Sequence, residues 1–230
     1  MTSASAAGPT RRGRPPKGST QLSRDAIVTA TLQVIDADGI SAVSMRTVAR
    51  ALGVDAKSLY NHVDGKDGLL DAVAENLLGS IAIPRATGDA ATDLRGIADA
   101  FRARALAHPE AASLVLTRQL TSIAGLAPVE ALLAVLRDAG CPVDESVRLL
   151  RVLVAAIIGT LLREVHAGPT FGATDAEGRS TRRDALERTE LPHIVEAAAE
   201  LAHYDRDAEF RFAVDAAIEI TLHRVAHLGG

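Results

Sequence analysis

Residues 44–63, SMRTVARALGVDAKSLYNHV, contain the pattern that decides the fold of this chain. Their first half has the i, i+3, i+4, i+7 spacing of one apolar helix face, at Met45, Val48, Ala49 and Leu52. Ser44 precedes this face as an N-cap, and Gly53 follows it as a helix-ending residue. The pattern predicts one short helix with a single buried face and a sharp turn after it.

A second short helix can begin directly after this turn. Asp55 supplies a carboxylate that can cap free backbone N–H groups, and Leu59 and Val63 then point inward, four residues apart. Two short helices joined by a tight glycine turn form the pattern of a helix-turn-helix. The stretch therefore predicts a protein that reads DNA.

The other face of the second helix carries neutral hydrogen-bonding groups and one cation, at Lys57, Ser58, Tyr60, Asn61 and His62. A solvated helix face usually mixes carboxylates with its bases, whereas this one has none after Asp55. Such a face suits phosphates and base edges. It is the candidate surface for contact with DNA.

Residues 22–79 resemble the DNA-binding domain of the TetR family of transcriptional repressors. The stretch LSRDAIVTATLQVIDADGISAVSM, residues 22–45, resembles the first helix of that domain, and VDGKDGLLDAVAENLL, residues 63–78, resembles its fourth. The LYxHV core of the family's third helix stands at residues 59–63. The match is far more specific than a bare helix-turn-helix pattern.

The resemblance implies a role for each matching position. Arg46 and Thr47 match positions that touch the DNA backbone or the groove edge, and Lys57 and Ser58 match positions that face the major groove. Tyr60 and His62 match positions that hydrogen-bond phosphates, and Lys66 matches the position of a phosphate clamp. Asn61 could contact either a base edge or the backbone.

Two positions leave alternatives open. Tyr60 can instead be a half-buried packing aromatic, and His62 an ordinary surface histidine. Ala56 departs from the family pattern, because some relatives carry a longer base-reading side chain there. Its methyl group can at most contact a thymine methyl.

Residues 1–21 form a basic arm rich in Ser, Gly, Pro and Arg, which we expect to be disordered without DNA. Arg12 and Arg14 lie in the sequence Arg-Gly-Arg-Pro, which resembles the core of an AT-hook and suits an A·T-rich minor groove. The alternative is an unstructured solubilising tail. In both cases the arm should add salt-dependent affinity for DNA.

The charge is unevenly distributed along the chain, whose net charge is −4. Residues 1–76 hold 9 basic and 8 acidic groups, whereas residues 77–230 hold 16 and 21, so the DNA-facing end is the less acidic one. The single cysteine, Cys141, excludes an intrachain disulfide, and neither a signal peptide nor a long apolar run is present. We expect a cytoplasmic bacterial protein without a membrane segment, associated with the nucleoid when bound to DNA.

The fold class indicated is all-α, with a helix-turn-helix domain at 22–82 and a helical effector-binding and dimerisation domain at 83–230. Helix breaks are expected at 84–88, 108–109, 125–128, 140–142 and the Gly-rich stretch 167–180. The clearest helices are expected at about 144–166 and 207–228, both with broad apolar stripes. No strand pattern competes with them.

The two long helices match positions that form a four-helix interface between subunits in TetR-like repressors, so the resemblance implies a homodimer. Two recognition helices about 34 Å apart would meet successive major grooves of a palindromic operator. The expected partners are therefore double-stranded DNA and a second copy of the chain.

The middle of the chain resembles the regulatory domain of the tetracycline-repressor subgroup, in which a small molecule enters between the helices. The resemblance implies a pocket with candidate lining residues Phe101, His108, Leu114, Thr117, Leu120, Leu133, Leu136, Ile157 and Leu161. Each of the apolar ones serves equally well as an ordinary core residue. We expect a largely apolar effector.

A metal or cofactor is not expected. No histidine stands around residues 114–117, where a magnesium ligand would be, and Arg163 occupies the position of the expected glutamate. We therefore do not infer a tetracycline–magnesium ligand. His223 and His227 lie four residues apart, but the spacing suggests no third ligand. Cys141 is either a redox-sensitive thiol or an incidental small residue.

An enzyme is the competing class, but phosphate-binding loops, nucleophile elbows and zinc clusters are absent from the sequence. The sequence therefore indicates a ligand-responsive, TetR-like repressor that is released from its operator by a small molecule. Two alternatives remain: an effector-free activator or architectural DNA binder, and a helical small-molecule sensor with a vestigial DNA-binding motif.

Overall fold

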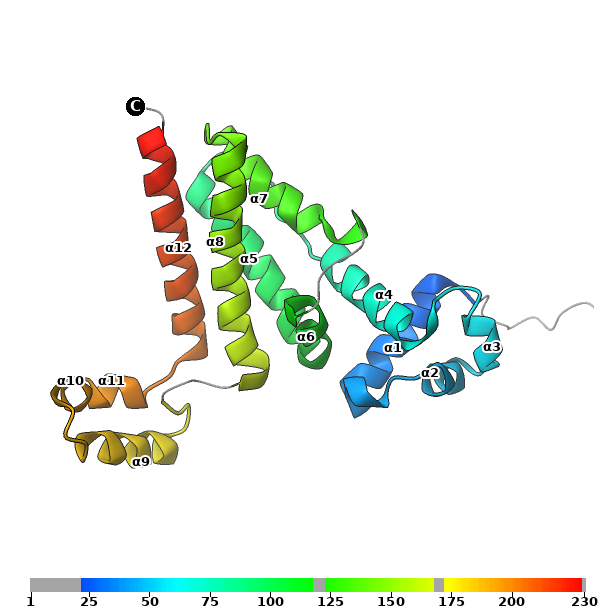
Figure 1. The fold of residues 1–230 in the computed structure, drawn as a ribbon, viewed down its shortest axis with the longest axis horizontal. Helices are drawn as coiled ribbons and strands as arrows, with labels where there is room; N and C mark the ends of the chain where they lie inside the picture. Colours follow the sequence, from blue (N-terminus) through cyan, green and yellow to red (C-terminus); the bar gives the residue numbers. More distant parts are fainter. Residues whose placement is uncertain (1–21, 118–122, 168–171, 229–230) are drawn as a thin grey trace, which may run out of the picture.

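A computed structural model describes residues 22–117, 123–167 and 172–228, and within these ranges the chain is built from helices joined by short turns (Figure 1). Strand pairing in the described ranges is limited to one isolated bridge between Ala173 and His203. The all-α prediction is confirmed. In the same ranges, no helix is long and apolar enough to cross a membrane.

The amino-terminal helices begin at side chains that cap them. They are α1 (Arg24–Asp38), a 3₁₀ turn (Ile40–Ala42), α2 (Met45–Leu52), α3 (Ala56–Leu59) and α4 (Gly65–Gly79). Ser23 Oγ accepts a hydrogen bond from the N–H of Ala26 at the start of α1. Gly53, with φ of +67°, ends α2 in the left-handed conformation that glycine adopts without strain.

A first core joins these helices. Its fully buried members include Ile27 and Ile35 of α1, Val48 of α2, Leu59 of α3 and Val73 of α4. The same core also takes in two residues from a later helix, Ala111 and Leu114. The helix-turn-helix is therefore packed directly onto the second half of the chain.

The second half is a helical bundle around a second core. It consists of α5 (Ala90–Ala107), α6 (Pro109–Thr117), α7 (Ala127–Asp138), α8 (Val143–Leu162) and α12 (Arg206–Leu228). Helices α8 and α12 run side by side in opposite directions (Figure 1). Leu153 and Ile157 of α8 pack with Phe210 and Val214 of α12 in this core.

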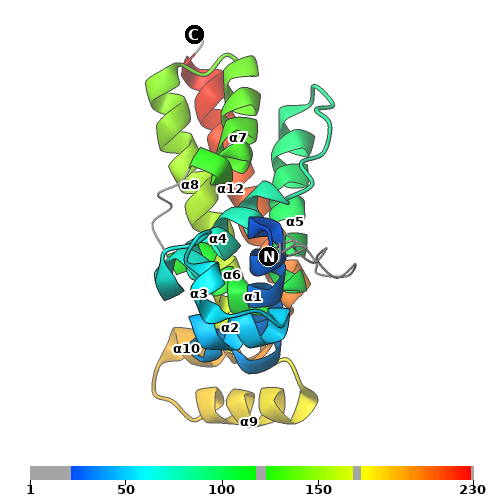
Figure 2. The ribbon, with the colours of Figure 1, turned by 90° about the vertical axis from the view of Figure 1, so that its right-hand side faces the viewer.

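Three short helices lie at one end of the α8 and α12 pair (Figures 1 and 2). They are α9 (Ala176–Glu187), α10 (Pro192–Glu196) and α11 (Ala198–Ala202). Helix α11 packs on α9 and buries Ala198 and Ala202. Every residue of α9 is exposed or half-buried, so this small layer adds little to the main core.

Three expected helix limits differ from those observed. The break expected over 167–180 is wrong from residue 176 onward, because Asp175 caps α9 by accepting a hydrogen bond from Gly178 N–H. Helix α3 ends at Leu59, and residues 60–62 form a turn. The long helix expected to end at His166 changes at Arg163–Ala167 into a π-helical turn. The helix expected at 207–228 is present as α12.

Candidate DNA interface and effector cavity

The polar face expected to contact DNA is exposed in the structure. Lys57, Asn61 and His62 are exposed, Tyr60 is 59% exposed, and Ser58 is half-buried. Tyr60 therefore does not pack into the core as a half-buried aromatic. The exposure of His62 suits both a phosphate contact and an ordinary surface histidine.

The start of α3 fixes the direction of this face. Asp55 Oδ1 accepts a hydrogen bond of 2.7 Å from Lys57 N–H, while Leu59 and Val63 are buried in the first core. The N–H of Val63 bonds to the carbonyl oxygen of Leu59, so the chain keeps a helical turn beyond α3. Ala56 is half-buried against the first core and contributes to packing.

Thr47 has a structural role that the sequence pattern did not indicate. Its Oγ1 accepts a hydrogen bond of 2.9 Å from Ser44 N–H, while Ser44 Oγ accepts one of 3.1 Å from Thr47 N–H. These reciprocal bonds form a capping box at the start of α2. Thr47 is half-buried, whereas its neighbour Arg46 is exposed beside it.

Lys66 lies in the first turn of α4 and is exposed. Asp64, at the N-cap of this helix, makes no side-chain capping bond, and Gly65 turns the chain with φ of +66°. A lysine amine beside the positive end of a helix is suited to binding a phosphate. Arg12 and Arg14 of the basic arm lie outside the described residues.

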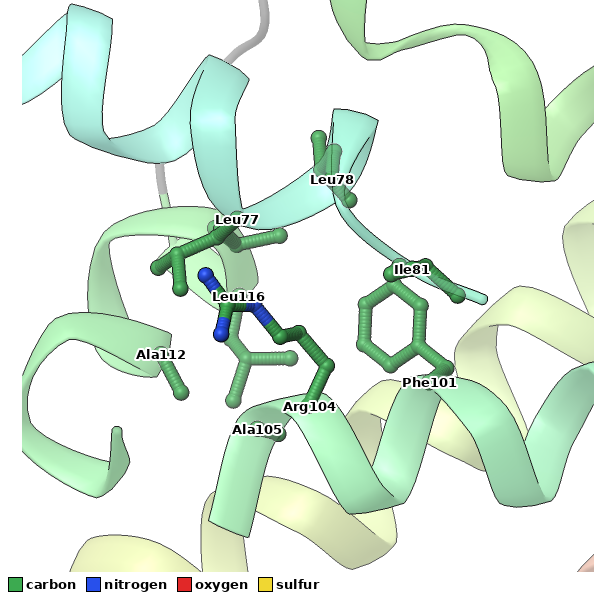
Figure 3. A pocket seen from close by; sticks show the side chains of 9 residues that line it. Leu77, Leu78, Ile81, Phe101, Arg104, Ala105, Ala112 and Leu116 are labelled. Atoms are coloured by element: carbon green, nitrogen blue, oxygen red, sulfur yellow. The ribbon is translucent and has the colours of Figure 1, made fainter. Parts of the chain in front are cut away.

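An apolar cavity of about 100 Å³ lies between α4, α5, α6, α7 and α8. The described residues that line it are all apolar; they are Leu78, Ile97, Phe101, Val115, Gly125, Pro128, Val129, Leu132, Val154, Ile157 and Ile158. A smaller cavity of about 20 Å³ adjoins it (Figure 3). The two cavities share Leu78, Phe101 and Val115. Arg104 supplies a polar group to the wall of the smaller cavity.

Two of the expected lining residues, Phe101 and Ile157, line the larger cavity. The others that the structure describes lie outside the lining of both cavities. Leu114 is in the first core, Leu161 is in the second, and Leu136 packs with Cys141 in a third, small cluster. Leu133 is half-buried. The side chain of Thr117 and all of Leu120 lie outside the described residues.

His108 contacts the DNA-binding half of the molecule. Its Nδ1 lies 2.8 Å from Asp36 Oδ2, near the end of α1. This contact joins the turn between α5 and α6 to the first helix. The sequence gave no sign of this pairing, because His108 and Asp36 are 72 residues apart.

Sequence reasoning missed Leu78, Val115, Leu132 and Arg104 as cavity residues. Leu78 and Leu132 have the same helical spacing as core residues, so only their position beside the cavity distinguishes them. Arg104 resembles one of several arginines along a solvated helix face. The packing of α4 against α5, α6 and α7 is what brings these side chains together.

An ion cluster closes the bundle near the π-helical turn. Arg102 donates to Glu164 Oε2 at 3.0 Å and to Glu164 Oε1 at 2.6 Å, and it also pairs with Asp207. The bond to Glu164 raises the pKa of Arg102, and the bond from Arg102 lowers the pKa of Asp207. The guanidinium carbon lies 4.8 Å from the centre of the Phe210 ring, as in a cation–π contact.

Within the described part of the chain, no three His, Cys, Asp or Glu side chains gather as metal ligands. His223 and His227 have ring centres 4.2 Å apart, and His227 Nδ1 contacts the carbonyl oxygen of His223. Cys141 is fully buried, which removes its thiol from contact with solvent oxidants.

Comparison with known proteins gives matches over both halves of the chain. The family model described as "Bacterial regulatory proteins, tetR family" matches residues 27–73, and the one described as "Tetracyclin repressor-like, C-terminal domain" matches residues 84–219. An HTH-type transcriptional regulator of Saccharopolyspora erythraea is 31% identical over 84% of this chain and 84% of its own. The class A tetracycline repressor from transposon 1721 of Escherichia coli is 28% identical over 78% of this chain and 80% of its own.

A solved structure shows a similar arrangement of helices. The Streptomyces coelicolor TetR family protein ActR, in complex with actinorhodin, has a TM-score of 0.78 and 25% identity, covering 90% of this chain and 99% of ActR. With matching models over both halves and relatives that are named transcriptional regulators, this chain belongs to the TetR family of bacterial transcriptional regulators, and it is not an enzyme.

Proposed function

We propose that this chain is a repressor that binds a palindromic operator as a homodimer and leaves it when a small molecule enters the cavity. The observation that carries the proposal is the exposed polar face at residues 57–62, continued by Lys66 and held by the buried Leu59 and Val63. Phosphate contacts from this face set position on the duplex, and base contacts set the sequence that is read.

The cavity supports control by a small molecule. It has the apolar lining of a ligand site. ActR, which is similar to this chain in fold, binds actinorhodin. DrrR1 of Streptomyces coeruleorubidus, 29% identical over 73% of this chain and 63% of its own, is named a transcriptional repressor. By similarity we infer repression and release by a ligand for this chain.

Helices α8 and α12 support the homodimer. Val152 of α8 is 43% exposed and Ile220 of α12 is 61% exposed, and the two helices pack side by side. Gly159 lies in the last turn of α8, where an added Cβ would meet no atom within 4 Å. A glycine in a helix costs stability relative to alanine, and here it leaves room for a second copy to approach closely.

The test is operator binding with and without small molecules. Genomic fragments from the source bacterium are selected on the purified chain, and the retained fragment is titrated by fluorescence anisotropy. Cell extract or a panel of apolar compounds is then added. We expect saturable binding to one fragment and release by at least one compound. A complex that persists with every addition would indicate an effector-free DNA binder, and the lack of any preferred fragment would indicate a vestigial motif.

A further inference from the structure

Among the described residues, Arg104 has no carboxylate partner, whereas Arg95 and Arg102 of the same helix each have one. The Nε of Arg104 is buried and has no hydrogen-bond partner within the described ranges. Its terminal nitrogen Nη2 donates a long hydrogen bond of 3.4 Å to Asn76 Oδ1. Arg102, two residues earlier on the same helix, instead holds two carboxylates. A buried polar atom without a partner is costly, so Arg104 needs an explanation.

The surroundings of Arg104 are apolar. Its side chain extends from α5 into the smaller cavity, between Leu77 of α4 and Ala112 and Leu116 of α6 (Figure 3). Phe101, one turn earlier, lies beside it and lines both cavities. Arg104 is half-buried and its contact with Asn76 lies on the exposed side, so it is the buried part of the guanidinium, at Nε, that loses hydration these residues do not replace. An anionic oxygen bound there would compensate for the lost hydration.

We propose that Arg104 binds the anionic oxygen of an effector whose remaining body is apolar and fills the larger cavity. The proposal rests on the proposed function in one respect, because it takes the bound ligand to be the effector. The two cavities adjoin at Leu78, Phe101 and Val115, so one molecule can reach from Arg104 into the larger space. A carboxylate, a sulfonate or an ionised phenol supplies the required charge, and the guanidinium matches such groups with two parallel N–H donors.

Binding at this place would also act on α4. Asn76, Leu77 and Leu78 are close to the end of α4, and Lys66 is at its start. An anion that takes the guanidinium competes with the long bond to Asn76. The same helix therefore carries a contact to the ligand site at one end and the candidate phosphate contact at the other.

The test uses two fluorescent probes that share one ring system. 8-Anilinonaphthalene-1-sulfonate carries an anionic group, and N-phenyl-1-naphthylamine carries none. We expect Arg104→Met to weaken binding of the sulfonate probe by about tenfold, or about 1.4 kcal/mol, and to leave the neutral probe nearly unchanged. Arg188→Met, at an exposed position after α9, should leave both probes unchanged.

The ratio of the two changes decides the proposal. A loss for the sulfonate probe that exceeds the loss for the neutral probe by about fivefold or more supports it, and any smaller ratio overturns it. If circular dichroism shows that Arg104→Met is unfolded, the wild-type chain decides instead. Dodecanoate should then displace the neutral probe at about fivefold lower concentration than dodecanol, and a smaller or reversed difference overturns the proposal.

Failure of this site and failure of the proposed function give different results. We expect ligand-free Arg104→Met to bind the selected operator as the wild type does. If Arg104→Met weakens the sulfonate probe selectively but the wild-type chain prefers no genomic fragment, the proposed function is refuted and the anion site stands. If the wild-type chain binds its operator but Arg104→Met does not weaken the sulfonate probe selectively, the anion site alone is refuted.

Discussion

The side chains proposed to face DNA depend on side chains that hold the helices in place. Thr47 and Ser44 fix the start of α2, and Asp55 fixes the start of α3. Because these caps satisfy backbone N–H groups that a helix start leaves open, they set where Lys57 and Tyr60 emerge. Tyr60 and Lys66 are the residues at which the proposed contact is most directly tested.

Tyr60→Phe and Lys66→Ala should weaken operator binding without loss of stability. Tyr60 is 59% exposed and Lys66 is exposed, so neither change opens the core. Loss of a hydrogen bond to a charged phosphate should lower affinity about tenfold for Tyr60→Phe. Lys66→Ala, present in both subunits, should reduce the slope of log affinity against log salt by about 2.

Fluorescence anisotropy at several salt concentrations measures both effects. Arg188→Ala, at an exposed position distant in sequence from the helix-turn-helix, is the control and should bind as the wild type does. Unchanged titration curves for both Tyr60→Phe and Lys66→Ala would show that the assigned phosphate contacts are wrong.

Asp93 gives a pH dependence of stability. Its Oδ1 accepts hydrogen bonds of 2.8 Å from both the N–H and the hydroxyl of Thr87, and these bonds lower the pKa of Asp93. A lowered folded-state pKa stabilises the fold above the unfolded-state value of about 3.9 and loses that effect as pH falls through the folded-state value. Asp93→Asn removes the titration. Urea unfolding midpoints of the wild type should therefore fall more steeply below about pH 4 than those of Asp93→Asn, and parallel curves would contradict this.

At the scale of elements, the ion cluster holds three segments together. Arg102 belongs to α5, Glu164 to the π-helical turn after α8, and Asp207 to the first turn of α12. The Glu164 side chain is only 6% exposed, so its charge depends on Arg102 for compensation. The cluster therefore fixes the end of α8 against the start of α12.

Arg102→Met should destabilise the fold by about 3 kcal/mol, because it leaves the buried Glu164 carboxylate without its partner. Urea unfolding monitored by circular dichroism measures this loss. The double variant Arg102→Met with Glu164→Gln should recover part of it, since the uncompensated charge is then gone. A double variant less stable than Arg102→Met would contradict the explanation.

Helix limits that depend on local capping and spacing were predictable except at α9, and those that depend on distant contacts were not. Gly53 and the i, i+3, i+4, i+7 pattern placed α2, and the apolar stripe placed α12. Helix α9 was missed because Gly178 lies in a Gly-rich stretch, although Asp175 was a visible capping residue. The π-helical turn at the end of α8 lies where Glu164 meets Arg102, a contact 62 residues apart in sequence.

At the scale of the whole molecule, α6 lies between the cavity and the helix-turn-helix. Leu114 packs into the first core, while its neighbours Val115 and Leu116 line the cavities. His108, just before α6, contacts Asp36 of α1. A ligand that moves α6 would therefore act on the amino-terminal helices. If that ligand weakens DNA binding, as we propose, linkage requires DNA to weaken binding of the ligand by the same factor.

The cavity was predictable in kind but not in detail. The resemblance to the tetracycline-repressor subgroup implied Phe101 and Ile157 as lining residues, and both line the larger cavity. Leu114 and Leu161 have the same spacing but fill cores. The packing of whole helices decides which apolar side chains line a cavity and which contact other side chains. The same packing leaves Nε of Arg104 without a hydrogen-bond partner.

Gly159→Leu should prevent dimer formation while the subunit stays folded. An added Cβ at this position meets no atom within 4 Å inside the subunit, but a leucine side chain would collide with a second copy packed on α8. Sedimentation velocity should show a monomer for Gly159→Leu and a dimer for the wild type, with equal helix content by circular dichroism. Phe212→Leu, a mild change at an exposed residue of α12, is the control and should remain dimeric. A dimer that persists in Gly159→Leu would place the interface elsewhere.

The most direct test is the mass of the wild-type complex with its selected operator duplex, measured by sedimentation in the presence of excess random DNA. Two 24.0-kDa chains should be found per duplex, and the complex should survive the competitor. A single chain per duplex, or a complex that random DNA removes as readily as unlabelled operator does, would contradict a paired helix-turn-helix as the DNA-reading element.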